Sequence, residues 1–199
     1  MDAERGLLYL PLASPIPADY GGDRGGDNLY GNSVVAVDIE TGAYRWHFQT
    51  IRHDLWDADP PAPPALFDIP RDDGSIPALG VTTKSGYLYI LTRETGEPVY
   101  GVEDIQVAAS DVPGERTSPT QPFPTRPPAL TPTTGMSLAD AFDLTPELEA
   151  AAHQAMQQFR IGPLYTPPSL KGSLVRPGGG GAVNWGGGAF DADTGFLYV

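Results

Sequence analysis

The chain contains no cysteine among its 199 residues, which excludes disulfide bonds and metal sites built on thiolates. It also lacks any run of about 18 apolar residues, so no segment is predicted to span a membrane. Basic side chains are scarce, since 12 lysines and arginines stand against 25 aspartates and glutamates and give a net charge of −13. Binding to nucleic acid needs a basic face, so this charge excludes nucleic acid as a partner.

Glycine and proline are abundant, with 24 and 22 copies respectively. Hydrophobic residues make up 40% of the chain and aromatic residues 10%, which is enough to build a core. This combination is typical of many short strands joined by tight turns. The length predicts one domain or a piece of one.

A short pattern recurs three times, with the form glycine, bulky residue, leucine, tyrosine, aliphatic residue. The copies are Gly6–Leu10, Gly86–Ile90 and Gly195–Val199. A strand, a Thr-Gly turn and a second strand are predicted over 34–46 and again over 90–100, because glycine supplies the positive φ of a tight hairpin turn. Repeated units that cannot bury their faces alone are typical of propeller blades.

Blade-like units are predicted at about 6–50, 80–103 and 185–199, the last one incomplete. A closed propeller needs about four blades or more, so the sequence predicts an all-β fold that is an internal fragment of a larger propeller. The segment 105–170 is predicted to be an insertion of loop and helix, because its first half is rich in proline and threonine.

One helix is predicted inside this insertion. Thr145 is expected to cap its start, Pro146 to occupy its first position and Gly162 to stop it. Its apolar residues recur at helical spacing, so the helix is expected to pack one side against an apolar surface. His153 lies on this helix and is interpreted as a surface or packing residue, not as a ligand.

The stretch HDLWDAD, residues 53–59, concentrates three carboxylates, an imidazole and an indole after a predicted strand. Trp56 is expected to bury its ring and orient its neighbours. A carboxylate beside a cation stays ionised, whereas one in an apolar pocket rises in pKa and can serve as a base. The alternative from composition alone is an acidic loop around a packed tryptophan.

Three further features are candidate binding elements. Lys84 lies in a predicted turn at a blade end and could hold an anionic ligand, or could be a plain exposed lysine. The glycine-rich stretch 178–188, with Asn184 and Trp185, would let the backbone approach a flat ligand, or is a flexible linker. The segment Gly21–Asn28 resembles one copy of a Gly/Asp calcium-binding repeat, or is a surface turn.

Together the residues resemble a known family, the pyrroloquinoline quinone (PQQ) dependent dehydrogenases, on the quinoprotein glucose dehydrogenase side. The stretches that carry the resemblance span nearly the whole chain and include YGGDRGGDNLYGNSVVAVDIETGAYRWHFQTIRHDLWDADPPAPP, TKSGYLYILTRETGEPVYGVE, SDVPGERTSPTQPFPTRPP, YTPPSLKGSLVRPG and NWGGGAFDADTGFLYV. The most specific elements are the His-Asp-Leu-Trp-Asp motif, the spacing from Asp57 to Lys84, and Ser-Pro-Thr-Gln-Pro-Phe-Pro.

The resemblance implies an eight-bladed propeller that holds PQQ and Ca²⁺ near its axis. It implies that Asp57 is the general base that takes the hydroxyl proton while hydride leaves carbon for the quinone, and also a calcium ligand. Lys84 would contact the quinone oxygens, and Asn184 and Trp185 would contact the cofactor. Ser14 stands where many relatives have an asparagine near calcium, and is the second candidate metal ligand.

The resemblance further implies oxidation of an aldose or another polyol on the periplasmic side, with electrons passed to a respiratory quinone or cytochrome. The missing blades would complete the pocket. Two alternatives remain: an alcohol dehydrogenase of the same family, and a propeller module without catalytic activity. Asp57 and Lys84 favour an enzyme, whereas Ser14 and Ile16, which depart from the glucose-type pattern, favour the inactive module.

Overall fold

The computed structural model describes all residues, 1–199. Short antiparallel strands make up most of the regular structure, and one α-helix and one 3₁₀ helix lie between the eighth and ninth strands. In chain order the elements are β1 (Leu7–Pro11), β2 (Ser33–Asp38), β3 (Tyr44–Gln49), β4 (Ala65–Arg71), β5 (Gly74–Thr82), β6 (Leu88–Thr92), β7 (Val102–Gln106), β8 (Thr120–Pro124), η1 (Leu138–Asp140), α1 (Pro146–Met156), β9 (Ala189–Asp191) and β10 (Phe196–Tyr198).

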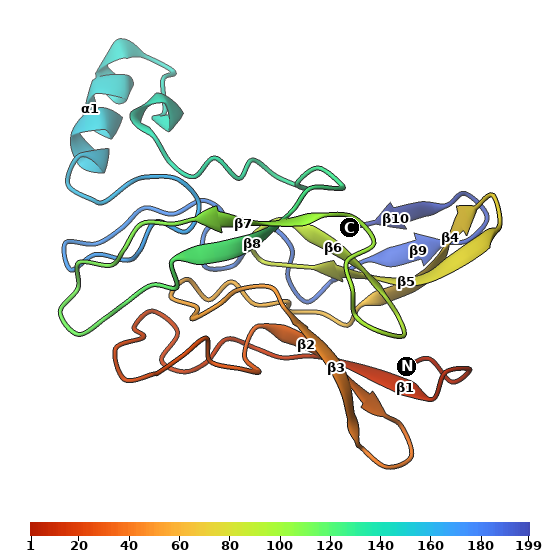
Figure 1. Cartoon of the computed structure of the whole chain (residues 1–199). Helices are drawn as coiled ribbons and strands as arrows, with labels where there is room; N and C mark the ends of the chain where they lie inside the picture. Colours follow the sequence, from red (N-terminus) through yellow and green to blue (C-terminus); the bar gives the residue numbers. More distant parts are fainter.

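The strands form two three-stranded sheets, β1-β2-β3 and β4-β5-β6, and two hairpins, β7-β8 and β9-β10. Figure 1 shows the first sheet below the second, with both hairpins on the side of the second sheet. Phe190 of β9 stacks on Phe67 of β4, with ring centroids 4.9 Å apart, so the last hairpin lies against the second sheet. All pairings between these strands are antiparallel, as expected for units of a propeller.

The main core lies between the two three-stranded sheets. Its buried members come from β1, β2 and β3 of the first sheet and from β5, β6 and the turn between them in the second: Leu7, Tyr9, Val34, Ala36, Trp46, Leu79, Val81, Tyr87, Tyr89 and Leu91. Tyr89 is 1% exposed and donates its hydroxyl to the carbonyl of Pro122, which ties β8 to this core. The fold is therefore held by sheet-to-sheet packing of aromatic and aliphatic side chains.

The predicted Thr-Gly turns are confirmed. Gly42 and Gly96 adopt φ of 70° and 71°, and each donates its N–H to the carbonyl four positions earlier, Asp38 and Thr92 respectively. Gly195 repeats this geometry at the turn between β9 and β10. A strand follows the first turn, but after Gly96 the chain makes only a single bridge, between Leu91 and Pro98.

The first sheet is fastened to the second sheet at one of these turns. A Cβ atom on Gly96 would come within 2.3 Å of the Trp46 ring, so glycine leaves the room that the indole needs against the turn. The indole Nε1 of Trp46 donates to the carbonyl of Arg93 at 3.1 Å, and the hydroxyl of Tyr9 donates to the same oxygen. One carbonyl thus joins side chains from β1 and β3.

The second sheet and the insertion differ from the sequence-based boundaries. The second sheet begins at β4, well before the expected start near residue 80. The hairpin β7-β8 reaches into the segment 105–170, which was expected to hold only loop and helix. In both places proline obscures the strand pattern: Pro70 lies in β4, and Pro122 and Pro124 lie in β8.

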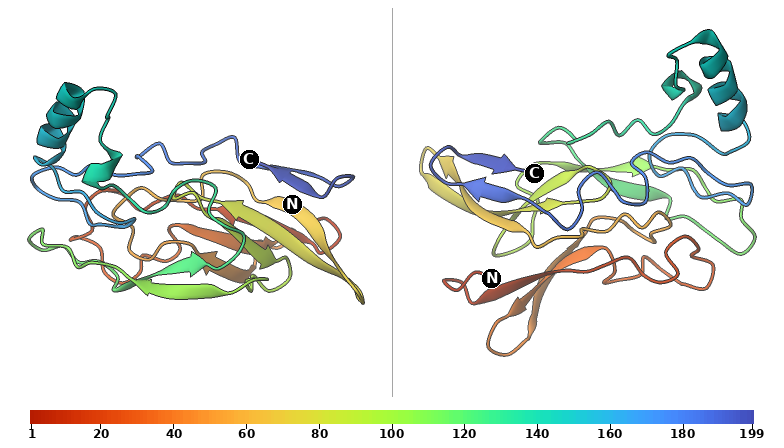
Figure 2. Two further views of the ribbon diagram at one scale, coloured as in Figure 1. Left: turned by 90° about the horizontal axis from the view of Figure 1, so that it is seen from above. Right: turned by 180° about the vertical axis from the view of Figure 1, so that it is seen from behind.

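The predicted helix is present but shorter, because it ends at Met156 and not near Gly162. Thr145 caps it by accepting a hydrogen bond from the Leu148 N–H, as expected. The helix stands off the sheets in every view of Figures 1 and 2, and Met156 is its buried residue. His153 contacts the carbonyl of Leu138 in η1, which is a packing role. No helix combines the length and apolar character needed to cross a bilayer.

Candidate active site

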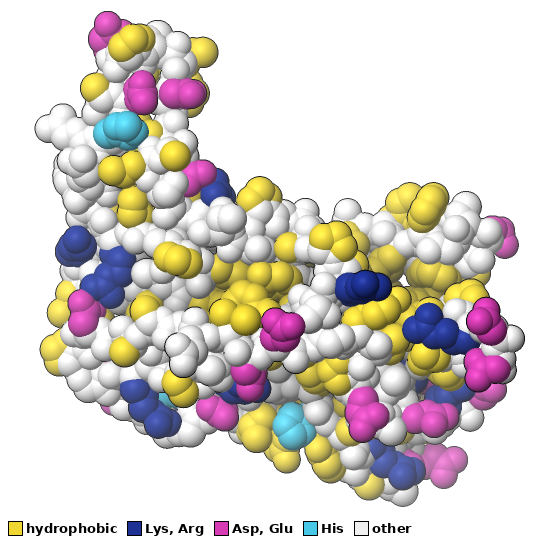
Figure 3. Space-filling view, turned by 45° about the horizontal axis from the view of Figure 1, so that its top comes forward, with side chains coloured by type: hydrophobic (Ala, Val, Ile, Leu, Met, Phe, Trp, Pro, Cys, Tyr) yellow, Lys and Arg dark blue, Asp and Glu magenta, His cyan; other side chains and the backbone are white.

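A cavity of about 570 Å³ lies where the 53–59 turn, the β5-β6 turn and the loops that follow α1 meet. Trp56, Asp57, Lys84, Tyr165 and Arg176 are among the side chains that line it. Figure 3 shows apolar side chains exposed on the body beside the foot of the helix. The chemistry-bearing stretch HDLWDAD therefore borders the main cavity.

Lys84 joins two carboxylates at the cavity wall. Its Nζ lies 2.7 Å from Oδ2 of Asp57 and 2.8 Å from Oδ1 of Asp59. The Lys84 side chain is 13% exposed, and burial lowers the pKa of its amine, but the bonds and charges of Asp57 and Asp59 outweigh that effect and hold the pKa above the ordinary value. Lys84 is thus a cation. The side chain of Asp57 is the more open of the two carboxylates, at 41% against 10%.

Asp54 does not line the cavity, and its carboxyl group accepts four hydrogen bonds within and around the turn. Its Oδ1 accepts the N–H of Trp56, and its Oδ2 accepts the N–H of Ala58, the amide of Asn32 and the hydroxyl of Ser14. The residue is 1% exposed, and burial raises the pKa of its carboxyl despite these hydrogen bonds. Its carboxyl group joins the turn to two residues far away in the sequence.

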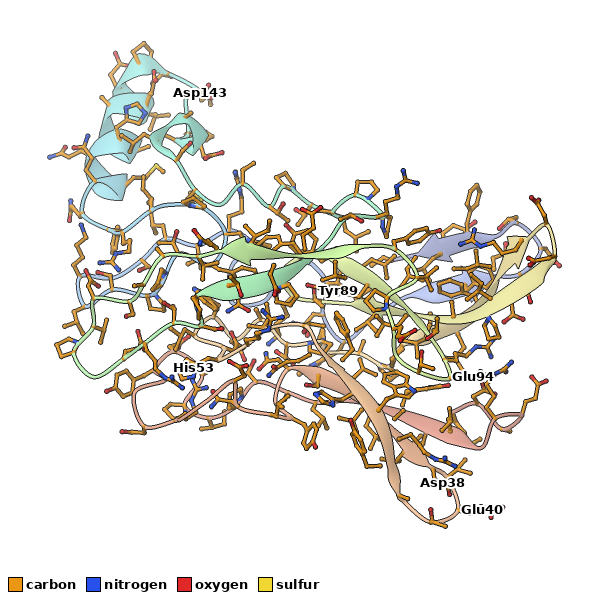
Figure 4. All side chains as sticks on the ribbon, viewed as in Figure 1. Asp38, Glu40, His53, Tyr89, Glu94 and Asp143 are labelled. Atoms are coloured by element: carbon orange, nitrogen blue, oxygen red, sulfur yellow. The ribbon has the colours of Figure 1, made fainter.

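The turn has an unusual backbone. His53 and Asp57 have φ of 48° and 54°, in the left-handed region that residues other than glycine seldom adopt. The ring of His53, labelled in Figure 4, contacts the carbonyl of Gly26 through Nδ1. Non-glycine residues in this region cluster at functional sites, where surrounding contacts hold them in place.

Arg24 organises the Gly21–Asn28 segment. Its guanidinium donates to the side-chain oxygen of Asn28 and to the carbonyls of Pro17, Tyr20 and Asp54. A calcium-binding loop would direct oxygen atoms of this kind toward the ion, but here they accept hydrogen bonds from the Arg24 guanidinium. The segment is a turn that buttresses the 53–59 stretch, in agreement with the turn alternative.

The loop after α1 closes the cavity on its other side. Tyr165 is 3% exposed, lies 5.1 Å from the ring of Trp56, and donates its hydroxyl to Ser85 at 2.8 Å. The Trp56 indole donates to the carbonyl of Thr166. Trp56 is only partly buried and lines the cavity, so the expectation that it buries its ring is met in part; its contacts with Tyr165 and Thr166 join the turn to the insertion.

The glycine-rich loop packs on Lys84. The N–H of Ala182 donates to the carbonyl of Lys84, and a Cβ on Gly181 would lie 2.6 Å from Lys84 Cβ. Asn184 bonds to the carbonyl of Gly180 within the loop, and Trp185 is 84% exposed. The loop therefore reaches the lysine through its glycines.

The structure brings Asp57 and Lys84 together but leaves the other three predicted site residues apart from them. Ser14 bonds to Asp54 and Asn32, not to Asp57, and Asn184 and Trp185 are not among the residues that line the cavity. No group of three or more histidine or acidic side chains converges as a metal site.

Sequence reasoning did not single out Asp59, Asp54 or Tyr165 as site residues. The two aspartates lie inside the quoted HDLWDAD stretch, so a signal existed, but residue type alone does not say which carboxylate faces the lysine. Tyr165 lies far along the sequence from Trp56, and nothing local to either residue indicates that they meet.

Comparison with known proteins places these features in a family. The family described as "Glucose/ethanol/alcohol dehydrogenase, beta-propeller domain", under the heading PQQ, matches residues 1–199. The chain belongs to this PQQ-dependent dehydrogenase propeller family. The resemblance and the propeller fold expected from the sequence are thereby confirmed.

Curated relatives match over almost the whole chain. A probable quinate dehydrogenase (quinone) of Xanthomonas campestris pv. juglandis is 40% identical over 188 residues, which is 94% of this chain and 24% of the relative. The quinoprotein glucose dehydrogenases of Gluconobacter oxydans and Escherichia coli are 36% and 35% identical, and the chain spans 24% and 23% of their lengths. The chain thus spans about a quarter of the curated relatives that it matches.

Solved structures agree on the fold. The quinohemoprotein alcohol dehydrogenases of Pseudomonas putida HK5 and Comamonas testosteroni each give a TM-score of 0.60 at 24% identity, with all of this chain and 24% of the other chain covered. At this level of identity the likeness shows the fold, and the strands described above correspond to part of their architecture.

Proposed function

We propose that this chain forms part of the catalytic propeller of a PQQ-dependent dehydrogenase that oxidises a hydroxyl group of an aldose or another polyol. The observation that carries the proposal is the ion pair of Asp57 and Lys84 at the wall of the main cavity. A carboxylate beside a fixed cation can receive a proton from a hydroxyl while the cation faces an anionic oxidant.

The residues around the cavity fit PQQ, which is a flat quinone with several carboxylates. Lys84 and Arg176 are the cationic side chains among the lining residues. Gly178 and Gly179 form an open backbone edge of the same cavity, with no atom within 4 Å of a Cβ built on either one. A flat, negatively charged ring system is complementary to such a wall.

PQQ, when bound, supplies the two-electron acceptor that takes hydride from the substrate carbon. The chain's own residues handle the proton and the orientation. Oδ2 of Asp57 is held by Lys84, and no hydrogen bond engages Oδ1, which is free to accept the substrate hydroxyl proton. Asp59 stays paired with Lys84 and keeps the amine in place as Asp57 gains its proton. Asn184 and Trp185 remain proposed contacts of the cofactor.

Calcium is the second proposed cofactor, with Asp57 and Ser14 as ligands from this chain. Hard oxygen ligands suit this ion. Asp57 offers a carboxylate, but the Ser14 hydroxyl already donates to Asp54 at 2.5 Å and accepts from Asn32 at 3.1 Å. The residues of this chain do not complete a calcium site. Blades beyond this chain would supply the other ligands.

The substrate, electron acceptor and compartment belong to the whole protein. We propose a polyol substrate, a respiratory quinone or cytochrome as acceptor, and a periplasmic location. The polyol substrate is supported by relatives that are named quinate, glucose and glycerol dehydrogenases. The quinone acceptor is supported by two relatives whose names include the word quinone. The lack of cysteine is compatible with an oxidising compartment.

The proposal is tested by titrating PQQ with Ca²⁺ into the metal-free, full-length gene product and following thermal unfolding. A ligand that binds the folded state raises the midpoint. The loaded protein is then assayed with glucose, quinate, glycerol and ethanol. We expect binding and PQQ-dependent oxidation of a polyol. Oxidation of ethanol alone would favour the alcohol dehydrogenase alternative, and binding without turnover of any substrate would favour the inactive module.

Lys84→Gln provides the matched test of the cofactor contact. It removes the charge and keeps a side chain of similar reach. Hydrogen bonds to charged groups contribute about 1.5–3 kcal/mol, so PQQ binding should weaken by roughly tenfold or more. Unchanged PQQ affinity in this variant would contradict the proposed contact between Lys84 and the quinone.

A further inference from the structure

Asp57 lies between two residues whose N–H groups are both held by Asp54. Trp56 precedes Asp57 and donates to Oδ1 of Asp54 at 2.9 Å, and Ala58 follows Asp57 and donates to Oδ2 at 3.0 Å. The chain between these two anchors is a single residue. The position of the Asp57 Cα, and the direction in which its side chain leaves the backbone, are therefore set by one carboxyl group.

We propose that Asp54 is a positioning residue for Asp57, which it holds against Lys84 by fixing the peptide on either side of it. The inference rests on the proposed role of Asp57 as the base. Asp54 does not line the cavity and touches neither substrate nor cofactor in this arrangement, so it acts through the backbone and is not itself a catalytic residue.

The strain in the turn explains why such an anchor is needed. Asp57 has φ of 54°, a conformation that an isolated aspartate leaves readily. With the two flanking N–H groups fixed, the left-handed conformation persists and directs the carboxylate toward the amine, 2.7 Å away. Without them the residue would relax to a commoner backbone conformation, and its carboxylate would move relative to Lys84.

Asp54 is in turn fixed from outside the turn. Asn32 donates to Oδ2 at 2.8 Å, and Ser14 donates to the same oxygen at 2.5 Å. Asn32 directly precedes β2, and its carbonyl accepts both the N–H and the hydroxyl of Thr50, which directly follows β3. The Asp54 carboxyl group thus fixes the position of the turn relative to strands β2 and β3 of the first sheet. This gives Ser14 a role in the site that does not depend on a metal.

Asp54→Asn tests the inference with little change in shape. An asparagine offers one acceptor oxygen in place of two and turns an NH₂ group toward the N–H donors. At least one of the Trp56 and Ala58 N–H groups then loses its acceptor. Because the side chain is buried, water cannot replace the lost bond easily.

Asp2→Asn is the matched control. Asp2 is also a buried aspartate, 5% exposed, and it accepts the N–H of Arg5 and pairs with Arg93. It does not line the cavity. Both substitutions should lower the thermal midpoint, so a change that follows Asp54→Asn alone reports positioning and not a general loss of stability.

Two measurements on the full-length protein decide the question. Hydrogen exchange of the metal-free, PQQ-free protein should be about tenfold faster in the peptide that covers 53–59 in Asp54→Asn, and unchanged in Asp2→Asn. In the PQQ-loaded protein, kcat should fall by roughly 10- to 100-fold in Asp54→Asn while KM and PQQ occupancy stay near wild type, because a shift of about 1 Å at a reacting group has effects of that size.

Unchanged exchange in the 53–59 peptide would overturn the inference, because Asp54 would not then hold the turn. Faster exchange with wild-type kcat would also overturn it, since the turn would not govern the base. An equal fall of kcat in Asp2→Asn would attribute the effect to stability. If the wild-type protein shows no PQQ-dependent turnover, the proposed function fails, and the exchange result still decides whether Asp54 fixes the backbone around Asp57.

Discussion

The contact between the glycine-rich loop and Lys84 allows a sharp prediction for Gly181→Ala. Gly181 has φ of 75°, and a Cβ there would lie 2.6 Å from Cβ and Cγ of Lys84 and 2.7 Å from its Cα. The left-handed conformation costs an alanine about 1 kcal/mol, and overpacking against Cα, Cβ and Cγ of Lys84 costs about 1–3 kcal/mol more. The closed form of the loop should therefore be destabilised by about 2 kcal/mol or more.

Hydrogen exchange of the Ala182 amide measures this cost directly. That N–H donates to the Lys84 carbonyl at 2.8 Å, so it exchanges when the loop leaves the lysine. A loss of about 2 kcal/mol corresponds to exchange about 30-fold faster, since 1.36 kcal/mol is a factor of ten. PQQ affinity should fall as well, because the loop borders the cavity.

Gly180→Ala is the control one residue away. A Cβ on Gly180 meets no atom within 4 Å, and its φ lies outside the left-handed region. The change should alter the free energy of loop opening by less than about 0.5 kcal/mol, as is usual for surface substitutions. Equal exchange rates in the two variants would refute the reasoning that the loop is built on contact between Gly181 and Lys84.

Two further predictions concern the scaffold. Trp46→Ala should lower the free energy of unfolding by about 3–5 kcal/mol, measured by urea unfolding, because the ring is 6% exposed and covers the Gly96 turn; a loss below about 1 kcal/mol would contradict the role assigned to this contact. Burial raises the pKa of the Asp2 carboxyl, but the hydrogen bonds from Arg5 and Arg93 and the charge of Arg93 outweigh burial and hold this pKa below the usual 3.8. The ionised Asp2 therefore stabilises the fold above about pH 4, and this stabilisation is lost as the pH falls through the lowered pKa of the folded state. Asp2→Asn should therefore flatten the loss of stability in acid below about pH 4, and an unchanged acid profile would argue against the pairing.

Local signals in the sequence predicted local structure well. The Thr-Gly turns follow from the conformational freedom of Gly42 and Gly96 and from hydrogen bonds within five residues. The helix start follows from Thr145 and Pro146, which act on their own first turn. The strands β4 and β8 contain proline, which lacks a backbone N–H and therefore argues against a strand when the sequence is considered alone. Their pairing with β5 and β7 depends on residues elsewhere in the chain, which no local pattern indicates.

The sequence identified the central pair of the candidate site but not the contacts around it. Asp57 and Lys84 were expected to act together, and the structure brings them into contact. The network of Asp54 was not foreseen, because Ser14 and Asn32 lie 40 and 22 residues away from it. Asn184 and Trp185, singled out as cofactor contacts, lie on the exposed part of the glycine loop and do not line the cavity.

The measurement that tests the central claim most directly is the turnover of Asp57→Asn in the PQQ-loaded, full-length protein. Asparagine tolerates positive φ and keeps the size of the side chain, so the turn and the bound cofactor should persist while the proton acceptor is lost. We predict PQQ occupancy near that of wild type and a loss of kcat of roughly 100-fold or more, which is the size of effect expected for a general base. Undiminished turnover with PQQ bound would show that Asp57 is not the base and would contradict the account.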